Sequence, residues 1–559
     1  MKSYKNKFLY ILILGMLMVA CDENYLDKVP LDSPSDVTFL SNQTELDMAV
    51  TGIYNNLCYI YSGMPFQLYL ERFTDICTER SAAVGSEDSH HNLIVGLWEN
   101  LYKGIARSNY VLTNMERGKD KIDPTIYNQR KAEARFLRAL SYHYLVELWG
   151  GVPLVTEPLT VEESQLPKNS KEEVVNFILT ELDECASDLP QENNPELGRA
   201  TKGSAWALLS RVALYNEKWD IAISAAQKVM NLEGSEYIID PDYKNLFQYQ
   251  GEYSKEKIFS VMFKRGVITH NIYRSCGSRN ASGFAAKIPT LQLVDSYECI
   301  DGLQIDKSPL YDPQHPYKNR DPRLNYSIAL PGTVYIGYQF ETHGDSVLCW
   351  NYNTTPPTRV TNNEATHAYA PFSGYCFRKY VDSLDLVIDR RNNEMDLCLI
   401  RYAEVLLNYA EAKIKAGQVD QSVLEAINKV RQRPSVNMPP ITTTDQDELY
   451  YAVCRERKYE LAFEGTRWFD ILRWGIAETV RNEPALGRMK RSYPSVAPTL
   501  DKWGSPSYDN IPIAAPGEST DFKLRLVRES TFEAPKNYLW PIPYTELQTN
   551  SAMAQNPGY

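Results

Sequence analysis

The stretch ATKGSAWALLSRVALYNEKWDIAISAAQKVMN, residues 200–231, decides the fold of this chain. It predicts two helices, 200–216 and 219–231, joined by a turn too short to let them separate. Small residues recur on both segments where two helices must approach closely, namely Ala205, Ala207, Ala222 and Ala226. The stretch therefore predicts a tightly packed helical hairpin.

A second stretch, farther along the chain, has the same design. Residues 401–416 and 420–432 predict two helices that turn at Gly417. Alanines again occupy the close positions, here Ala403, Ala410, Ala412 and Ala426. Both hairpins resemble the tetratricopeptide type. Because long insertions separate them, the sequence does not predict a regular solenoid.

Outside the two hairpins, apolar residues also recur at helical spacing, which predicts a mostly α-helical protein. Further helices are expected at residues 44–58, 127–149, 171–189 and 448–475. A strand is expected at 258–263, after which Gly, Pro, Asn and Tyr become common and regular periodicity is lost. This predicts a loop-rich insertion, 265–395, carried between helical elements. Loops on a rigid scaffold are where binding residues are expected.

The first residues, MKSYKNKFLYILILGMLMVACDEN (1–24), predict a secretory signal. Three lysines precede an apolar run, 8–19, that is too short to span a bilayer and that ends at Ala20 and Cys21. We expect a signal peptide at 1–20 and an extended tether at 21–43. The LMVAC end resembles a bacterial lipobox, which implies cleavage before Cys21 and lipid on its thiol. The alternative is an ordinary secreted protein in which Cys21 is incidental.

The charge balance excludes several classes of partner. The 71 acidic residues outnumber the 59 Lys and Arg residues, giving a net charge of −12, and the two signs are interleaved. This argues against nucleic acid and against adhesion to anionic lipid. No stretch after the signal reaches the roughly 18 apolar residues of a spanning helix. We therefore expect attachment to a membrane through the N-terminal lipid alone.

The sequence predicts neither a metal site nor a cofactor. The nine cysteines other than Cys21 stand singly, without a C-x-x-C pair, and no histidine falls within a cysteine cluster. His90 and His91 are adjacent, but no ligand spacing accompanies them, so a solvated loop is expected. Gly-rich phosphate loops and nucleophile elbows are absent from the sequence.

Three carboxylates at helical spacing raise the question of catalysis. Glu456, Glu460 and Glu464 fall on one face of the helix expected at 448–475. A glycosidase needs two carboxylates that flank the bond it cleaves. The row is surrounded by basic residues, namely Arg455, Arg457, Lys458, Arg467 and Arg473. We expect charge pairing along this helix and no catalytic residue. A surface-anchored glycoside hydrolase is the alternative.

Several phrases, in order along the chain, resemble the SusD/RagB family of outer-membrane nutrient-binding lipoproteins. They are LWENLYKGIARSNYVL (97–112), EARFLRALSYHYLVELWGGVPLV (133–155), RATKGSAWALLSRVALY (199–215), PTLQLVDSYECIDG (289–302), NRDPRL (319–324), IRYAEVLLNYAEA (400–412), RERKYELAFEGTRWFDILRWG (455–475) and QNPGY (555–559). The resemblance implies a SusD-like fold with four tetratricopeptide-like hairpins and an irregular second subdomain. On this basis we expect a helical domain at 44–235 and a second domain at 256–559, the latter including the hairpin 400–432.

The resemblance also implies a function and a partner. Such proteins sit on the cell exterior as a lid over a SusC-type TonB-dependent transporter of the outer membrane and capture oligosaccharide or, in some cases, peptide. No catalysis is implied. We expect a glycan ligand here, with peptide binding as the alternative and a scaffold without a small ligand as the third possibility.

Two stretches carry the residue types that a glycan site needs. Sugars present C–H faces that stack on flat rings and hydroxyls that polar side chains bind. In the first stretch, 74–92, Thr74-Asp75 resembles a family motif that precedes a ligand-site loop, which makes Asp75 and Arg80 candidates. The second stretch, 335–352, has Arg359 nearby and offers four candidate rings, Tyr335, Tyr338, Trp350 and Tyr352. Each ring serves either to pack beneath a loop or to contact a ligand.

Overall fold

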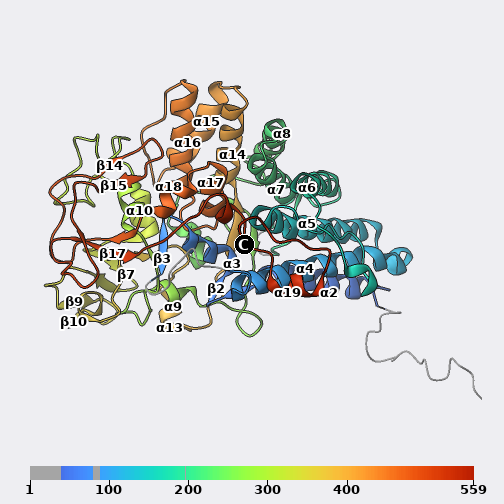
Figure 1. Ribbon diagram of the computed structural model, residues 1–559, viewed down its shortest axis with the longest axis horizontal. Coiled ribbons are helices and arrows are strands. Elements are labelled where there is room, and N and C mark those ends of the chain that lie inside the picture. The colour runs from blue at the N-terminus through green and yellow to red at the C-terminus, as the bar shows by residue number, and fades with distance from the viewer. Residues whose placement is uncertain (1–38, 80–87, 195–196) are drawn as a thin grey trace, which may run out of the picture.

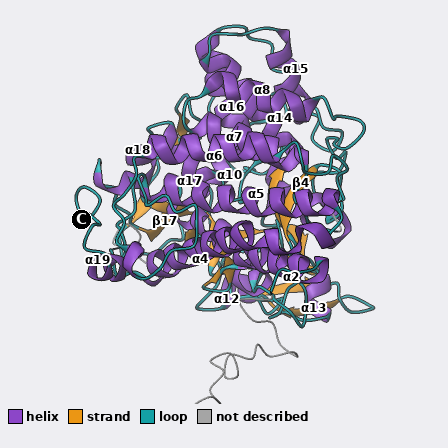
Figure 2. Cartoon of the chain, turned by 90° about the vertical axis from the view of Figure 1, so that its right-hand side faces the viewer, coloured by secondary structure: helices purple, strands orange, loops and turns teal. Residues whose placement is uncertain are grey.

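A computed structural model describes residues 39–79, 88–194 and 197–559 of the chain. Helices of the N-terminal part fill one side of the molecule, and short strands and loops fill the other (Figure 1). The helices lie in successive layers, from α2 and α4 at one end to α14 and α15 at the other (Figure 2). The mostly helical character expected from the sequence is confirmed. The expected signal peptide and Cys21 lie outside the described residues.

The helices of the described ranges vary widely in length. In chain order they are α2 (Gln43–Tyr54), α3 (Phe66–Tyr69), α4 (Asn92–Asn114), α5 (Pro124–Trp149), α6 (Lys171–Cys185), α7 (Lys202–Tyr215), α8 (Trp219–Met230), α9 (Ile272–Cys276), α10 (Leu291–Ser296), α11 (Pro322–Ser327), α12 (Asn363–Thr366), α13 (Leu384–Val387), α14 (Tyr402–Lys415), α15 (Gln421–Arg431), α16 (Gln446–Glu460), α17 (Arg467–Arg473), α18 (Ala477–Asn482) and α19 (Tyr544–Thr549).

The strands are short and form several small sheets. In chain order they are β1 (Ile60–Tyr61), β2 (Met64–Pro65), β3 (Cys77–Glu79), β4 (Lys257–Val261), β5 (Lys287–Pro289), β6 (Ile328–Ala329), β7 (Thr333–Tyr335), β8 (Tyr338–Phe340), β9 (Leu348–Asn351), β10 (Thr358–Thr361), β11 (Cys376–Phe377), β12 (Leu397–Arg401), β13 (Ala485–Gly487), β14 (Thr499–Leu500), β15 (Pro506–Ser507), β16 (Ile513–Ala514) and β17 (Leu524–Arg528).

The α7–α8 hairpin forms where the sequence predicts it. Thr201 caps α7: its side chain accepts from the amide of Ser204, and the Ser204 hydroxyl contacts the Thr201 amide in return. Ala222 and Ala226 of α8 are fully buried against α7. Their small side chains let the two backbones approach closely, which explains the tight pairing of the two helices.

The α14–α15 hairpin, distant in sequence, joins the same helical stack. The turn between its helices uses Gly417 at φ +71°, and Asp420 caps α15 by accepting from the amide of Ser422. Helix α14 packs against α7 and α8 as well as against α15. The second predicted hairpin is therefore confirmed, and it extends the layers that α7 and α8 begin.

The single helix expected at 448–475 is wrong, because the structure has two helices, α16 and α17, separated by residues 461–466. Within this break Phe463 has φ +60° and Gly465 has φ +84°. A Cβ at Gly465 would lie 2.7 Å from the carbonyl oxygen of Gln67, so only glycine fits there. Contact with a segment almost 400 residues earlier in the chain thus breaks the helix.

The insertion expected to be loop-rich, 265–395, contains more regular structure than its composition predicts. Strands β5 to β11 fall within it, and four of them form an antiparallel sheet in the order β10-β9-β8-β7. Each strand has three or four residues, too few to give a clear period-2 pattern. This sheet lies at the end of the molecule farthest from the helical layers (Figure 1).

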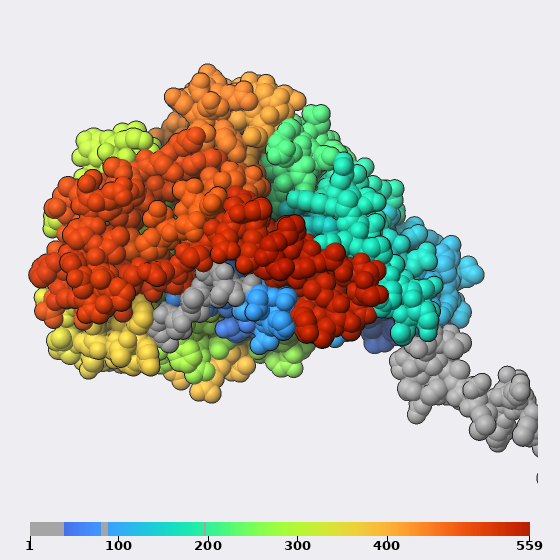
Figure 3. Space-filling view, in the orientation of Figure 1, coloured from blue at the N-terminus to red at the C-terminus, as the bar shows by residue number. Residues whose placement is uncertain are grey.

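The C-terminal tail runs back across the helical half. The Trp540 amide donates to the Leu148 carbonyl over 2.7 Å, and the Trp149 indole donates to the Pro541 carbonyl over 2.9 Å. The Asn556 amide also donates to the Trp149 carbonyl. Figure 3 shows the C-terminal segment in red, crossing from the strand-rich half to the N-terminal helices. The tail is therefore fastened to the C-terminal end of α5.

Candidate functional site

The antiparallel sheet β7–β10 has one face open to solvent. Directly paired residues share a face, so the pairings Val334 with Gln339 and Trp350 with Arg359 define it. Trp350 is 39% exposed and Val334 is 52% exposed. On β9 the preceding residue, Cys349, points to the opposite face and is buried. We call the solvent face of this sheet, with Val334, Gln339, Trp350 and Arg359, the Trp350 face.

The Trp350 face presents a flat ring beside polar groups. The Arg359 guanidinium carbon lies 5.0 Å from the centroid of the Trp350 ring, which is a cation–π arrangement. The Gln339 side-chain oxygen accepts from the Trp350 amide over 3.3 Å. A ring that is accessible, held from one strand and flanked by hydrogen-bonding groups is suited to stack against the C–H face of a sugar.

A strained turn holds the sheet in place. Ile336 and Gly337, between β7 and β8, have φ values of +48° and +70°, the signature of a two-residue hairpin turn. A β-branched residue such as Ile336 rarely adopts positive φ, so the surroundings must compensate. The Ile336 side chain is buried, and its carbonyl accepts from the Asn353 amide over 3.2 Å. The Tyr352 amide donates to the Gly337 carbonyl.

The structure brings three of the six predicted ligand residues to this sheet in accessible positions. They are Tyr338, Trp350 and Tyr352. Tyr338 pairs with Asn351, so it lies on the face opposite Trp350 and is half-buried. Tyr352 is 45% exposed just after β9, beside the β7–β8 turn.

Tyr335 lies in the core, unlike the three accessible rings. It is 3% exposed, its hydroxyl donates to the Phe377 carbonyl over 2.6 Å, and the Arg378 guanidinium lies over its ring. Its hydrogen bond and its ring face are already used within the protein. Packing, one of the two roles expected for these rings, is therefore the role that the structure gives Tyr335.

Asp75 is also buried and engaged. Its carboxylate accepts two hydrogen bonds from the Arg467 guanidinium, over 2.9 and 2.8 Å. Burial alone would raise the pKa of Asp75, but the charge of Arg467 lowers it to about 2. This pair fastens α17 to the N-terminal segment, far in sequence from β7–β10. Arg80, the other candidate in that stretch, lies outside the described residues.

Sequence reasoning did not name Gln339 or Val334 as members of the site. The signal that could have found them is strand alternation around the YIGY turn, 335–338, which places every second residue on one face. In the sequence, Arg359 is identified only as lying near the 335–352 stretch. Its pairing with Trp350 depends on the β9–β10 register, which the sequence alone does not fix.

The carboxylate row is buried in ion pairs, but it does not lie on one helix as expected, because Glu456 and Glu460 are in α16 and Glu464 is in the break that follows it. Glu460 has no exposed surface and accepts from Arg401 and Arg433 over 2.7 Å each and from Arg323 over 3.0 Å. Burial would raise the pKa of Glu460, but Arg433, Arg401 and Arg323 together hold it well below its usual range. Glu460 is thus held as a charged, enclosed acceptor.

The expected charge pairing of the row is confirmed, but the expected partners are wrong. Glu456 pairs with Arg323 and Arg431, and Glu464 pairs with Arg401 and Lys379. These cations come from α11, β12, α15 and the segment after β11, because α16 is enclosed by those elements. Basic residues on α16 form ion pairs with other carboxylates. Arg457, for example, pairs with Asp470.

Within 39–79, 88–194 and 197–559, no group of three or more His, Cys, Asp or Glu is arranged to hold a metal ion. His91 caps α4 by accepting from the Leu93 amide, and the His90 ring stacks on Tyr544. In the same ranges, no helix has the length and apolar character needed to cross a membrane.

Comparisons with known proteins place the chain among relatives of known fold. A sequence model of the SusD family matches residues 248–559, and a second model, described as starch-binding and associating with the outer membrane, matches residues 24–214. SusD-like protein P25 of Formosa agariphila is 25% identical over 83% of this chain and 90% of its own length. The starch-binding protein SusD of Bacteroides thetaiotaomicron is 23% identical over 77% of this chain and 73% of its own.

A solved structure agrees with these matches. The crystal structure of a SusD-like carbohydrate-binding protein from Bacteroides fragilis superposes with a TM-score of 0.79 at 28% sequence identity. The superposition covers 92% of this chain and all of the other. The arrangement of helical hairpins with a strand-rich second half is therefore shared across both chains.

Proposed function

The chain belongs to the SusD family, and from this premise we propose that it is a cell-surface protein that binds glycans on its Trp350 face. The observation that carries the proposal is the accessible Trp350 ring, paired across the sheet with Arg359. Relatives described as starch-binding and carbohydrate-binding support the choice of ligand class.

The Trp350 face has the chemistry that glycan recognition needs. The indole offers a flat apolar surface to sugar C–H groups, and Arg359 and Gln339 offer donors and an acceptor to the hydroxyls around it. Tyr352 adds a second exposed ring at the end of the same sheet. Because such a face is open and shallow, we expect affinities from micromolar to millimolar, about −8 to −4 kcal/mol.

Weak binding suits a protein that hands its ligand on. We propose that the glycan passes to a SusC-type TonB-dependent transporter of the outer membrane. We further propose that lipid on Cys21 holds the protein at the outside of that membrane. Two or more acyl chains give firm anchoring, whereas a single chain gives only marginal binding.

We propose that the protein does not hydrolyse the glycans that it binds. The carboxylates at catalytic-looking spacing, Glu456, Glu460 and Glu464, are enclosed and saturated by arginines and a lysine. The Trp350 face itself carries no carboxylate pair, and a glycosidase needs two such groups on either side of the bond.

The experiment that tests this function is a binding screen of purified residues 22–559 against a polysaccharide panel, by affinity electrophoresis and calorimetry. We expect at least one neutral polysaccharide to retard the protein in affinity electrophoresis and to give a heat of binding in calorimetry. We expect no release of reducing sugar. Binding of peptides with no binding of any polysaccharide would overturn it.

A further inference from the structure

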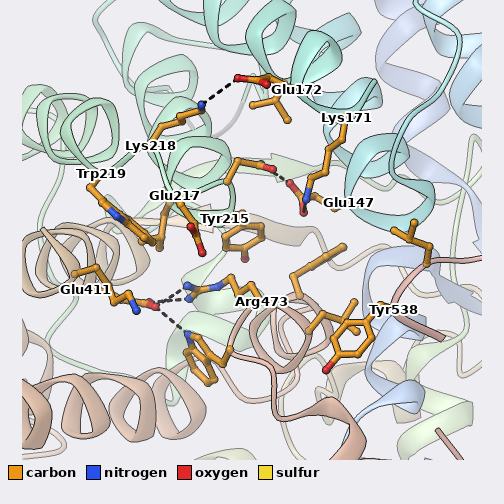
Figure 4. A pocket seen from close by; sticks show the side chains of 18 of the residues that line it. Glu147, Lys171, Glu172, Tyr215, Glu217, Lys218, Trp219, Glu411, Arg473 and Tyr538 are labelled. Carbon is orange, nitrogen blue, oxygen red and sulfur yellow. Dashed lines mark hydrogen bonds and ion pairs between the residues drawn. The ribbon is translucent and has the colours of Figure 1, made fainter. Parts of the chain in front are cut away.

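The helical half contains a cavity of about 620 Å³, remote from the Trp350 face. Its walls come from the α7–α8 turn, the ends of α5 and α6, helices α14 and α17, and the C-terminal tail near Tyr538 (Figure 4). Ligand pockets in proteins usually measure about 300–1,000 Å³, so this cavity is of ligand size.

Aromatic rings form much of the cavity wall. Trp219 and Tyr450 are half-buried, and the Lys415 ammonium lies 5.9 and 4.9 Å from their ring centroids. Trp474 and Tyr538 are also half-buried and line the same cavity. The Trp474 indole donates to Glu411 over 2.9 Å, which fixes the ring. The cavity therefore offers several positioned flat surfaces to a ligand.

A buried hydroxyl in the cavity lacks a partner. Tyr215 is only 5% exposed, and its hydroxyl makes no hydrogen bond within the described part of the chain. Figure 4 shows that hydroxyl directed into the cavity, between Glu217 and Arg473. The Arg473 guanidinium lies over the Tyr215 ring and keeps it in place. Because an unsatisfied buried hydroxyl costs free energy, a ligand hydroxyl at this point would relieve that cost.

The charges of the lining balance one another. Lys171 pairs with Glu147, Lys218 pairs with Glu172, and Arg473 pairs with Glu411. Lys415 and Glu217 add one further charge of each sign. With four acids and four bases, the lining gives no net attraction to an ionic ligand, so it favours a neutral one.

Glu217 is available to bind a ligand. No hydrogen bond or ion pair engages its side chain among residues 39–79, 88–194 and 197–559, and its backbone has φ +59°. That conformation is uncommon for a residue with a Cβ and is held by the short α7–α8 turn. Both Glu217 and Tyr215 line the cavity, so an acceptor and a donor belong to the same site (Figure 4).

We propose that this cavity is a second carbohydrate site, independent of the Trp350 face, that takes one or two neutral sugar units. Stacking on the Trp219 ring and hydrogen bonds to Tyr215 and Glu217 hold the sugar. The site is expected to function whether or not the Trp350 face binds a glycan.

The test uses full-length mature protein carrying Trp350→Ala, which weakens the Trp350 face, and the contribution of the cavity is read from the further loss of binding in cavity variants made in this background. Calorimetry measures the binding of maltose, cellobiose, laminaribiose, lactose and mannobiose. We expect at least one to bind, and we expect Trp219→Ala in the same background to weaken it about tenfold. Trp206→Ala is the matched control, because Trp206 is another half-buried indole of this hairpin, lies 5.7 Å from the Lys228 ammonium, and is outside the cavity.

A second variant keeps the test decisive if Trp219→Ala does not fold. Tyr215→Phe removes only the unpartnered hydroxyl, so thermal stability should not fall, while disaccharide affinity should drop about fivefold. The proposal is overturned if none of the five disaccharides binds the Trp350→Ala protein, or if binding survives both Tyr215→Phe and Trp219→Ala. Loss of polysaccharide binding in Trp350→Ala alone reports separately on the Trp350 face.

Discussion

Arg359 lies across the indole of Trp350, with its guanidinium carbon 5.0 Å from the ring centroid and the two residues directly paired between β10 and β9. The register of a two-strand contact thus decides which cation meets which ring. The Arg359 guanidinium also donates to the Leu348 carbonyl over 3.2 Å, which restrains it. Both side chains remain accessible to a ligand.

Arg359→Ala is expected to lower glycan affinity about threefold to tenfold, because it removes hydrogen-bond donors and the charge that orients the ring. Arg359→Lys keeps the charge but loses the planar fork, so its effect should be intermediate. Calorimetric titration of the three proteins with the same glycan makes the comparison. Equal affinities for all three would exclude Arg359 from the site.

Glu460→Gln is expected to destabilise the protein by about 3–5 kcal/mol, because it leaves three buried arginines short of a counter-charge. The matched control is Glu172→Gln, whose carboxylate is 73% exposed and 3.7 Å from Lys218, and which should change stability by less than about 1 kcal/mol. Urea unfolding measures both variants.

The same Glu460→Gln protein also tests for catalysis. Reducing-sugar release should be undetectable for the wild type and for the variant, since this carboxylate is enclosed. Release by the wild type that disappears in Glu460→Gln would instead identify the row as a hydrolytic site.

Glu71 should make stability fall as pH rises. It is fully buried, and burial raises its pKa to about 8, while one carboxylate oxygen has no hydrogen-bond partner in the described ranges. In the unfolded chain its pKa is about 4.3, so between these values the folded state holds a proton that the unfolded state has lost. The stabilising contribution is therefore complete below about pH 4 and is lost as pH rises through about 8.

Glu71→Gln removes this titration while keeping an acceptor for the Gly465 amide. Between pH 5 and pH 8 the free energy of unfolding of the wild type should fall by about 3 kcal/mol relative to that of Glu71→Gln. Other groups titrate in both proteins and cancel in the difference. Parallel pH profiles would mean that Glu71 is ionised in the folded state.

Cys21→Ala is expected to leave a folded protein that no longer fractionates with the outer membrane, because lipid on Cys21 is the only anchor we infer. Cell fractionation followed by a high-salt wash makes the measurement. A variant that stays in the membrane pellet after the wash would require another mode of attachment.

The hairpins could be predicted from sequence because their causes are local. Alanines at the close positions and the short turn near Gly417 lie within the segments that they shape. The break between α16 and α17 could not be predicted, because its cause is contact between Gly465 and Gln67, far apart in the chain. Local patterns fix local elements, whereas distant contacts interrupt them.

The candidate site could be predicted only in part, for the same physical reason. Tyr335 and Tyr338 flank one turn and look alike in sequence, yet Tyr335 is in the core and Tyr338 is half-buried at the start of β8. The Thr74-Asp75 motif predicts a ligand contact for Asp75, but its partner Arg467 is 392 residues later. Trp350, by contrast, is accessible where the sequence suggested a ligand-contacting ring.

Calorimetry of Trp350→Ala against a bound glycan tests the central claim most directly. A stacked ring contributes roughly 0.5–1.5 kcal/mol beyond the area that it buries, so we expect affinity to fall several-fold to about tenfold. The melting temperature should change by less than about 2 °C, because the ring faces solvent, and Trp206→Ala should leave affinity unchanged. Unchanged affinity together with a large fall in melting temperature would contradict the account, since Trp350 would then be a packing residue and the glycan site would lie elsewhere.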